Sequence, residues 1–160
     1  GKADSNFLAR VENYKRGELL KIKADEKSRI QRFLLAHQLK YASSPSGLLY
    51  PKELQLANNT GGELAVRFQL ASLDGQVFQS GFRRLTLPPV NVPKVQAGFE
   101  PAQRPGVAHL PGFVEAMRII PKGRKTKMII PSALIFGATG NNTDVPPYTP
   151  LVCEMEVLNN

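Results

Sequence analysis

Few side chains in this 160-residue chain are of the types that carry metal, redox or nucleophilic chemistry. It has one cysteine, Cys153, and two histidines, His37 and His109, which lie far apart in the sequence. A single cysteine excludes an internal disulfide and a zinc site built on cysteines. With only two histidines, far apart in the sequence, neither a histidine-based metal site nor a Ser/His/Asp triad is favoured. The residue types therefore predict a site with no metal and no cofactor.

The segment Gly137–Gly140 (GATG) has the composition of a phosphate-binding loop and follows an apolar stretch. Loops of that kind present their backbone N–H groups at the start of a helix. Here Pro146 and Pro147 follow before a helix has room to form. We therefore interpret this region as a turn that serves some purpose other than holding phosphate.

The formal net charge is +8. Residues 1–42 hold ten Lys and Arg against five Asp and Glu, whereas the remaining chain holds eleven against eight. The positive excess therefore lies mainly in the N-terminal segment, and aromatic residues are not interleaved with it. We expect no nucleic-acid partner, and binding through this segment ranks third among the functions considered.

Residues 5–41 contain no proline and have the pattern of helix, which we expect in two pieces that are broken near Gly17, with Asp25 as the N-cap of the second. Apolar residues recur on one side of the second piece. This stripe consists of Ile30, Phe33, Leu34 and His37. We expect it to pack on the following domain or on a second copy of the chain.

The pattern changes to strands after the turn-rich segment 42–47 (ASSPSG). We expect strands in GLLYPKELQL (47–56), on both sides of the Asp74-Gly75 turn in 63–81, and as a separate short strand in RRLTLPP (83–89). Residues 88–109, with five prolines, are expected to form a long loop. The division predicted is an N-terminal helical extension, 1–44, and a domain, 45–160.

A short helix is expected to start near Leu110, with Phe113, Met117 and Ile120 on its buried face, and to end at Pro121. Two strands, 124–131 and 151–158, close the chain. In the first, Lys125 and Lys127 alternate with Thr126 and Met128, so the basic residues Arg118, Lys122, Arg124, Lys125 and Lys127 are interpreted as a solvated row. Cys153 is expected to be an inert buried thiol. The fold class predicted is α+β, with a bent antiparallel sheet wrapping one short helix.

Three stretches in this order resemble the FKBP-type peptidyl-prolyl cis-trans isomerases. They are AVRFQLASLDGQVFQSG, LPGFVEAMRIIPKGRKTKMIIP and LIFGATGNNTDVPPYTPLVCEMEVL, and the likeness covers roughly residues 48–160. The lead-in DEKSRIQRFLLAHQLKYASSPSGLLY is similar, less strongly, to exported bacterial members, often lipoproteins. On this basis we expect a periplasmic or outer-membrane-anchored protein whose signal segment precedes Gly1, with the cytoplasm as the alternative.

The resemblance implies a proline pocket beneath a flap formed by 137–145 and the two following prolines. It implies catalytic roles for Phe68, Phe78, Gln79, Phe113 and Phe136. It implies substrate contacts from Leu85, Leu110, Val145 and Cys153. Phe113 stands where the family usually has the tryptophan floor, and the Leu110 N–H would receive a ligand carbonyl. Without the resemblance, these apolar residues would be interpreted as plain core.

Several positions depart from the family pattern. Gln79 stands at the aspartate position, Phe136 and Phe68 at tyrosine positions, and Cys153 at an aromatic position, while the loop before Phe113 is about a dozen residues longer than in compact members. We therefore expect a weak isomerase acting on X–Pro bonds of folding proteins. Its partners would be proline-containing polypeptides, with a macrolide as the small-molecule ligand. The alternative is a non-enzymatic binding or chaperone module.

Overall fold

The computed structural model describes residues 2–59, 62–87, 107, 110–141 and 143–158, with side chains described from Arg16 onward. The expected loop 88–109 lies outside the described residues except for Val107. In chain order the main elements are α1 (Lys2–Ala36), β1 (Tyr41–Ser43), β2 (Leu49–Pro51), β3 (Glu63–Ala71), β4 (Val77–Thr86), α2 (Pro111–Ile119), β5 (Thr126–Ile130) and β6 (Leu151–Val157). Two 3-10 helices, η4 (Ser132–Leu134) and η5 (Gly137–Thr139), lie between β5 and β6.

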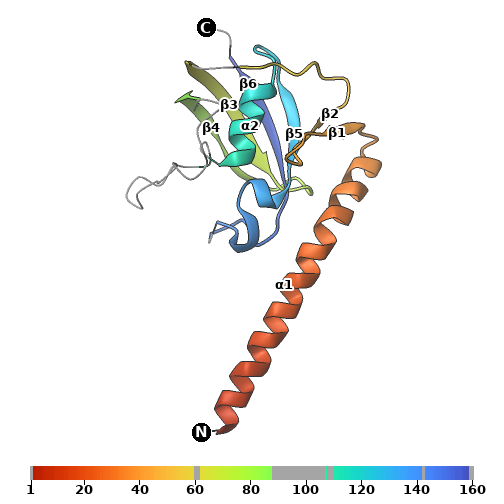
Figure 1. Cartoon of the computed structure of the whole chain (residues 1–160), viewed down its shortest axis with the longest axis vertical. Helices are drawn as coiled ribbons and strands as arrows, with labels where there is room; N and C mark the ends of the chain where they lie inside the picture. Colours follow the sequence, from red (N-terminus) through yellow and green to blue (C-terminus); the bar gives the residue numbers. More distant parts are fainter. Residues whose placement is uncertain (1, 60–61, 88–106, 108–109, 142, 159–160) are drawn as a thin grey trace.

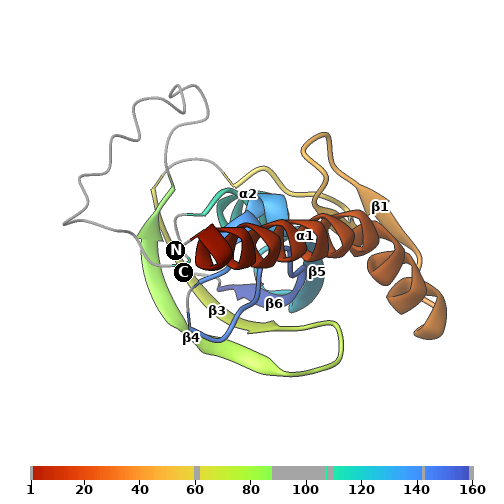
Figure 2. The same ribbon diagram turned by 90° about the horizontal axis from the view of Figure 1, so that it is seen from below.

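The six strands form one sheet in the order β1-β2-β5-β6-β3-β4, and the pairings are antiparallel. The sheet curves around α2, which lies against its inner face (Figures 1 and 2). The predicted α+β class, a bent antiparallel sheet around one short helix, is confirmed. The closing strands and the short helix that starts after Leu110 are also found where the sequence predicts them.

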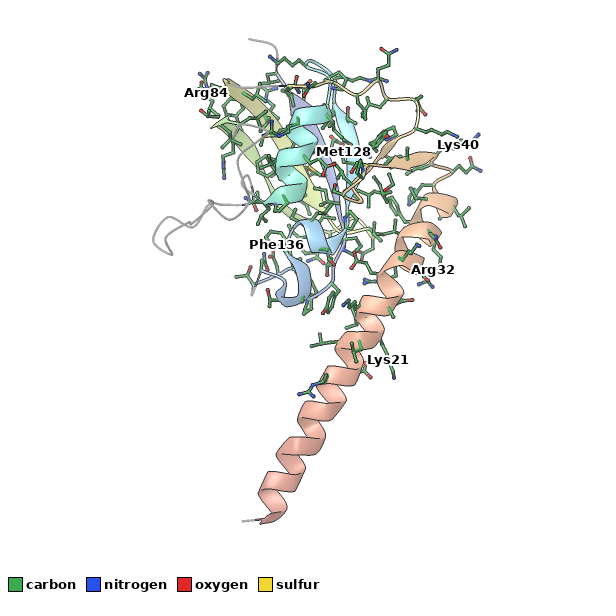
Figure 3. All side chains as sticks on the ribbon, in the orientation of Figure 1. Lys21, Arg32, Lys40, Arg84, Met128 and Phe136 are labelled. Atoms are coloured by element: carbon green, nitrogen blue, oxygen red, sulfur yellow. The ribbon has the colours of Figure 1, made fainter. Side chains whose placement is uncertain are left out.

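The core lies between α2 and the inner face of the sheet. Burial alternates along β3 and β6, as expected for strands with one covered face. Met128 is fully buried beneath α2 (Figure 3). The fully buried large side chains are Leu48, Val66, Leu70, Leu87, Phe113, Met117, Ile120, Met128, Ile129, Ile130, Leu151 and Met155.

α1 is one continuous helix of 35 residues, so the predicted break at Gly17 is wrong. A glycine inside a helix costs only about 1 kcal/mol relative to alanine, and helix-forming residues flank it on both sides. Asp25 therefore lies within the helix and is not an N-cap; its carboxylate is 3.7 Å from the Arg29 Nε. No helix within the described residues combines the length and the apolar composition that crossing a bilayer requires.

α1 ends earlier than predicted because Gln38 adopts a left-handed conformation with φ of 54°. The Leu39 N–H donates to the Leu34 carbonyl at 2.9 Å, and the Gln38 N–H donates to the Leu35 carbonyl at 3.2 Å. These two bonds make a Schellman motif, in which glycine is the usual left-handed residue. A glutamine there gives no sequence signal, so the stop was missed.

The end of α1 lies beside the domain, and its first half projects away from it (Figure 1). In the predicted stripe, Ile30 is buried at 7% exposure, while Phe33 and Leu34 are half-buried. His37 is exposed; its ring lies against the Phe33 ring, with centroids 4.4 Å apart, and its backbone N–H donates to the Phe33 carbonyl at 3.1 Å. Packing of the stripe on the domain is therefore confirmed for Ile30, whereas His37 lies past the helix end.

Two strand predictions need correction. The segment read as a turn-rich connection contains β1, whose residues Tyr41–Ser43 pair with β2 in a hairpin closed at Gly47, where φ is 105°. Only three residues of the strand expected at 47–56 are extended in β2. RRLTLPP is not a separate strand, since β4 runs unbroken from Val77 to Thr86 along β3. β1 and β2 have three residues each, which is too few for an alternation of apolar and polar residues to be recognised in the sequence.

Candidate functional site

Phe68 and Phe113, the two phenylalanines here called the floor, are predicted site residues that contact each other. Phe68 is on the buried face of β3, and Phe113 is in the first turn of α2. Their ring centroids are 5.0 Å apart with the planes at 89°, an edge-to-face contact. Phe68 is 4% exposed and Phe113 is fully buried. The floor is therefore aromatic, dry and fixed by the core.

Cys153 is on β6, the strand next to β3, and pairs with Leu70 of β3. The side chain is fully buried, and burial raises the pKa of the thiol to about 12, with the Glu154 carboxylate adding to the rise. A thiol in this state stays protonated and does not act as a nucleophile. The predicted burial of the thiol is confirmed.

β4 supplies one wall of the candidate pocket. Leu85 pairs with Leu64 and Gln79 pairs with Leu70 on β3, and both are half-buried. The register then shifts, so that Phe78 is the extra residue of a β-bulge. Bulges turn side chains away from strict alternation. Phe78 and Leu85 both pack on the core cluster.

Arg83 belongs to the same face of β4 and was missed in the sequence analysis. It pairs with Val66, whose side chain is fully buried on the inner face of β3. Its guanidinium carbon lies 5.8 Å from the centroid of the Phe68 ring. Gly81, which pairs with Phe68, leaves this space open, because a Cβ there would lie 3.3 Å from the Arg83 Nη1. The sequence could have indicated this position, because Arg83 is two residues from Leu85 and side chains two residues apart on a strand lie on the same face.

The start of α2 brings Leu110 next to the floor. Leu110 precedes Pro111 in the N-cap position and is half-buried against the core cluster. Its N–H donates to the carbonyl of Val107 at 3.0 Å. A ligand carbonyl would therefore have to displace or share this hydrogen bond. Gly112 allows the close approach of α2 to β5, since a Cβ there would lie 2.4 Å from the Ile130 Cγ2.

The segment 132–148, here called the rim loop, carries Phe136 and Val145. Phe136 is half-buried and packs on the core cluster, below α2 in Figure 3. Val145 is 4% exposed. Gly140 adopts φ of 67°, and a Cβ there would lie 2.1 Å from the Val145 carbonyl oxygen. The loop therefore requires glycine at this position.

Asn141 organises the tip of the rim loop. Its Oδ1 accepts hydrogen bonds from the backbone N–H groups of Thr143, Asp144 and Val145, at 3.0, 3.0 and 2.8 Å. Its Nδ2 donates to the Asp144 carboxylate at 2.7 Å. This bond is the main cause that lowers the pKa of Asp144, and the Thr143 hydroxyl adds to it. The tip is thus held by polar contacts and not by burial.

Seven of the nine predicted site residues belong to the core cluster or pack against it, and Gln79 and Val145 are not among its members. Phe68, Phe113 and Cys153 belong to the buried core cluster, and the partly buried ones packed against it are Phe78, Leu85, Leu110 and Phe136. Within the described residues no three His, Cys, Asp or Glu side chains are grouped as metal ligands.

Of the basic residues interpreted as a solvated row, Lys125 and Lys127 point outward and lie 3.6 and 3.8 Å from the Glu154 carboxylate. Thr126 and Met128 between them are buried. The predicted alternation is confirmed. These residues lie on the outer face of the sheet, away from the floor formed by Phe68.

The chain thus combines a curved antiparallel sheet, one short helix in its concave face, and an aromatic pair where helix and sheet meet. The family model described as FKBP-type peptidyl-prolyl cis-trans isomerase matches residues 57–158. The chain belongs to this FKBP family. The match contains the floor, the β4 wall, α2 and the rim loop.

Two curated relatives from Escherichia coli K12 are similar to this chain. The FKBP-type 22 kDa peptidyl-prolyl cis-trans isomerase is 34% identical over 86 residues, 54% of this chain and 35% of that protein. The FKBP-type peptidyl-prolyl cis-trans isomerase FkpA is 26% identical over 162 residues, 96% of this chain and 53% of that protein. The chain therefore spans about a third to a half of the length of these relatives.

Solved structures agree with the fold. The crystal structure of FkpA from Escherichia coli superposes with a TM-score of 0.65 at 22% identity, covering 99% of this chain and 70% of that one. A peptidyl-prolyl cis-trans isomerase from Pseudomonas syringae pv. tomato superposes with a TM-score of 0.60 at 20% identity, covering 87% of this chain and 92% of that one. The FkpA match includes α1 as well as the domain.

Proposed function

We propose that this chain catalyses the cis–trans isomerisation of X–Pro peptide bonds in folding polypeptides. The uncatalysed reaction crosses a barrier of about 18–20 kcal/mol and takes tens of seconds or longer. Only the partial double bond of the amide has to be lost. The planar amide is strongly dipolar because of resonance, and the twisted amide is much less so. An apolar pocket therefore disfavours the planar ground state more than the twisted transition state.

The edge-to-face contact of Phe68 with Phe113, at 5.0 Å between centroids, is the observation that carries this proposal. It supports a floor on which a proline ring would stack. Phe78 and Leu85 would form one wall of the pocket, and Phe136 and Val145 the other. Leu110 and Cys153 would complete the apolar lining, and Gln79 would offer a neutral polar group at the rim.

The partners proposed are proline-containing polypeptides, with a macrolide as a competing small ligand. The compartment proposed is the bacterial cell envelope, supported by the likeness of the lead-in 25–50 to exported family members and by the extent of the FkpA match. A cytoplasmic protein is the alternative. Cell fractionation of the full-length protein, with the membrane and periplasmic fractions assayed separately, tests this part.

A protease-coupled assay on a short X–Pro peptide tests the activity. The native chain is expected to accelerate conversion of the cis peptide in proportion to protein concentration, and a macrolide is expected to inhibit it. Heat-denatured protein is the control. A rate equal to the uncatalysed rate at every concentration would contradict the proposal.

A second candidate function is a binding module that holds proline-containing segments without turning them over. The hydrogen bond from the Leu110 N–H to the Val107 carbonyl favours it, because this donor is already engaged. The neutral side chains Gln79 and Phe136, at positions where the family usually has aspartate and tyrosine, favour it too. Peptide binding measured by calorimetry, without acceleration in the protease-coupled assay, would distinguish this candidate from the isomerase.

A further inference from the structure

The second half of α1 is hydrogen-bonded to both ends of the rim loop. The Glu26 carboxylate accepts from the backbone N–H of Ser132, at 2.8 Å, and from its hydroxyl, at 2.5 Å. The Arg29 guanidinium donates to the carbonyl of Tyr148 at 2.9 Å. These bonds join residues that are 106 and 119 positions apart in the sequence. α1 is thus attached to the first and the last residues of the loop.

The two attached ends are also bonded within the loop. The Tyr148 N–H donates to the Gly137 carbonyl at 2.9 Å, and the Ile135 N–H donates to the Ser132 carbonyl at 3.0 Å. Phe136 lies between these two bonds in the sequence. Its backbone is therefore fixed on both sides by groups that themselves bond to α1. A displacement of α1 from the domain would loosen Phe136 as well.

The environment of Ser132 makes the Glu26 contact the stronger attachment. Ser132 is 2% exposed, and it starts η4, for which Pro131 supplies no side-chain cap. An N–H at the start of a helix needs an acceptor from outside the helix. A carboxylate makes a charge-assisted bond there, stronger than one between neutral groups. Ile30, 7% exposed, adds an apolar contact one turn further along α1.

A cleft of about 900 Å³ lies between α1 and the domain, next to the contacts of Glu26 and Arg29. Its lining includes Ile30, Leu34, Pro131 and Tyr148. The first half of α1 projects away from the domain, and Lys21 and Arg32 have exposed side chains on this helix (Figure 3). The polar attachments at Glu26 and Arg29 are three residues apart, so they lie within a single turn of a long helix.

We infer that Glu26 and Arg29 are positioning residues for the isomerase, holding the rim loop over the pocket so that catalysis depends on α1. The inference rests on the proposed function. Glu26 acts through Ser132, and Arg29 acts through Tyr148. The N-terminal helix is then part of the working enzyme and not merely a tether.

Glu26→Ala in the full chain tests this, with two measurements made at a temperature where the protein is folded. We expect kcat/KM for a short X–Pro peptide to fall about three- to tenfold, the size of one weakened charged hydrogen bond. We expect faster hydrogen exchange at the amides of Ser132, Ile135 and Tyr148, which donate the hydrogen bonds at the attached ends of the loop, with exchange in β3 and β6 unchanged. Glu26→Gln keeps one acceptor oxygen and should recover part of both effects.

Glu18→Ala is the matched control, because Glu18 is a carboxylate on the same helix whose ion pair, 3.7 Å to Lys21, is exposed. It should leave activity and loop exchange unchanged. Should Glu26→Ala fail to fold, Ser132→Ala removes only the hydroxyl donor and is expected to act in the same direction.

If the native chain is active and Glu26→Ala changes neither activity nor loop exchange, the inference is wrong. If the native chain shows no isomerase activity, the proposed function fails. In that case faster exchange in the Glu26→Ala loop still supports attachment of the loop by α1, and unchanged exchange overturns it.

Discussion

The floor of the candidate pocket and its rim are stabilised by different forces. The floor consists of Phe68 and Phe113, which are 4% exposed or less and packed in the core. The rim loop is mostly half-buried or exposed and is held by hydrogen bonds, from Asn141 within the loop and from α1 outside it. Changes in the floor should therefore reduce stability first, and changes in the rim should reduce activity first.

The largest effect is expected from Phe113→Ala. Removing a fully buried phenylalanine side chain costs about 3–5 kcal/mol of unfolding free energy. Urea unfolding at constant pH measures this cost. Phe82→Ala is the matched control, because Phe82 is on β4 but 43% exposed, and it should cost far less. Equal losses for the two variants would contradict the description of the floor as core.

Gly140→Ala should be next in size and should affect the rim. A left-handed φ costs a non-glycine residue about 1–2 kcal/mol, and the new Cβ would also collide with the Val145 carbonyl, 2.1 Å away. We expect lower kcat/KM and altered chemical shifts confined to the rim loop. Gly75→Ala has a similar φ, 97°, but open space around it. Gly75→Ala should lower stability through its backbone strain and leave kcat/KM unchanged. An equal loss of kcat/KM in Gly75→Ala would argue against a role for the rim loop in activity.

Restoring polar groups at the pocket tests the chemistry of the site. One neutral hydrogen bond contributes about 0.5–1.5 kcal/mol and one to a charged group about 1.5–3 kcal/mol, and about 1.4 kcal/mol is tenfold in rate. Losing one hydrogen bond of each kind, at Phe136 and Gln79, predicts an activity roughly a hundredfold below that of relatives with tyrosine and aspartate at these positions. Gln79→Asp with Phe136→Tyr should recover part of it, read as kcat/KM. No gain would show that these two positions do not limit the rate.

The smallest effect at neutral pH concerns Cys153, whose contribution to the pH dependence of stability arises only at high pH. The folded-state pKa of the thiol is raised from 9.0 to about 12, so above pH 9 the unfolded chain loses this proton and the folded chain keeps it. Stability should therefore fall as pH rises from about 9 toward 12, by at most about 1.4 kcal/mol per pH unit from this group. Melting temperatures of the native chain and of Cys153→Ala, measured across this range, give the difference. Parallel curves would contradict the assigned shift.

The parts of the fold with a local pattern were predictable from the sequence. Alternation in β3 and the Asp74-Gly75 turn predicted the hairpin, and the apolar spacing from Phe113 to Ile120 predicted the buried face of α2. Strand β1, the left-handed Gln38 and the continuity of α1 at Gly17 left no such pattern. Each depends on pairing or capping that a few residues determine.

The site shows the same division. The aromatic floor residues were identified through the family resemblance, and their burial follows from strand and helix periodicity. The contact of Glu26 with Ser132 spans 106 positions, and nothing near either residue in the sequence indicates it. Arg83 was hidden among the charged residues of β4, since only the strand register places it beside Phe68. Long-range polar contacts thus required the structure.

Exchange spectroscopy by nuclear magnetic resonance on an X–Pro peptide, with the protein in catalytic amount, tests the central claim most directly. It reports the cis–trans exchange rate itself, without a coupling protease. The native chain should raise this rate above the uncatalysed one. Phe136→Ala, at the half-buried rim, should lower the catalysed rate several-fold, while Phe82→Ala on the outer face should not. A rate that stays at the uncatalysed value, or a catalysed rate that Phe136→Ala leaves unchanged, would contradict an isomerase pocket at this place.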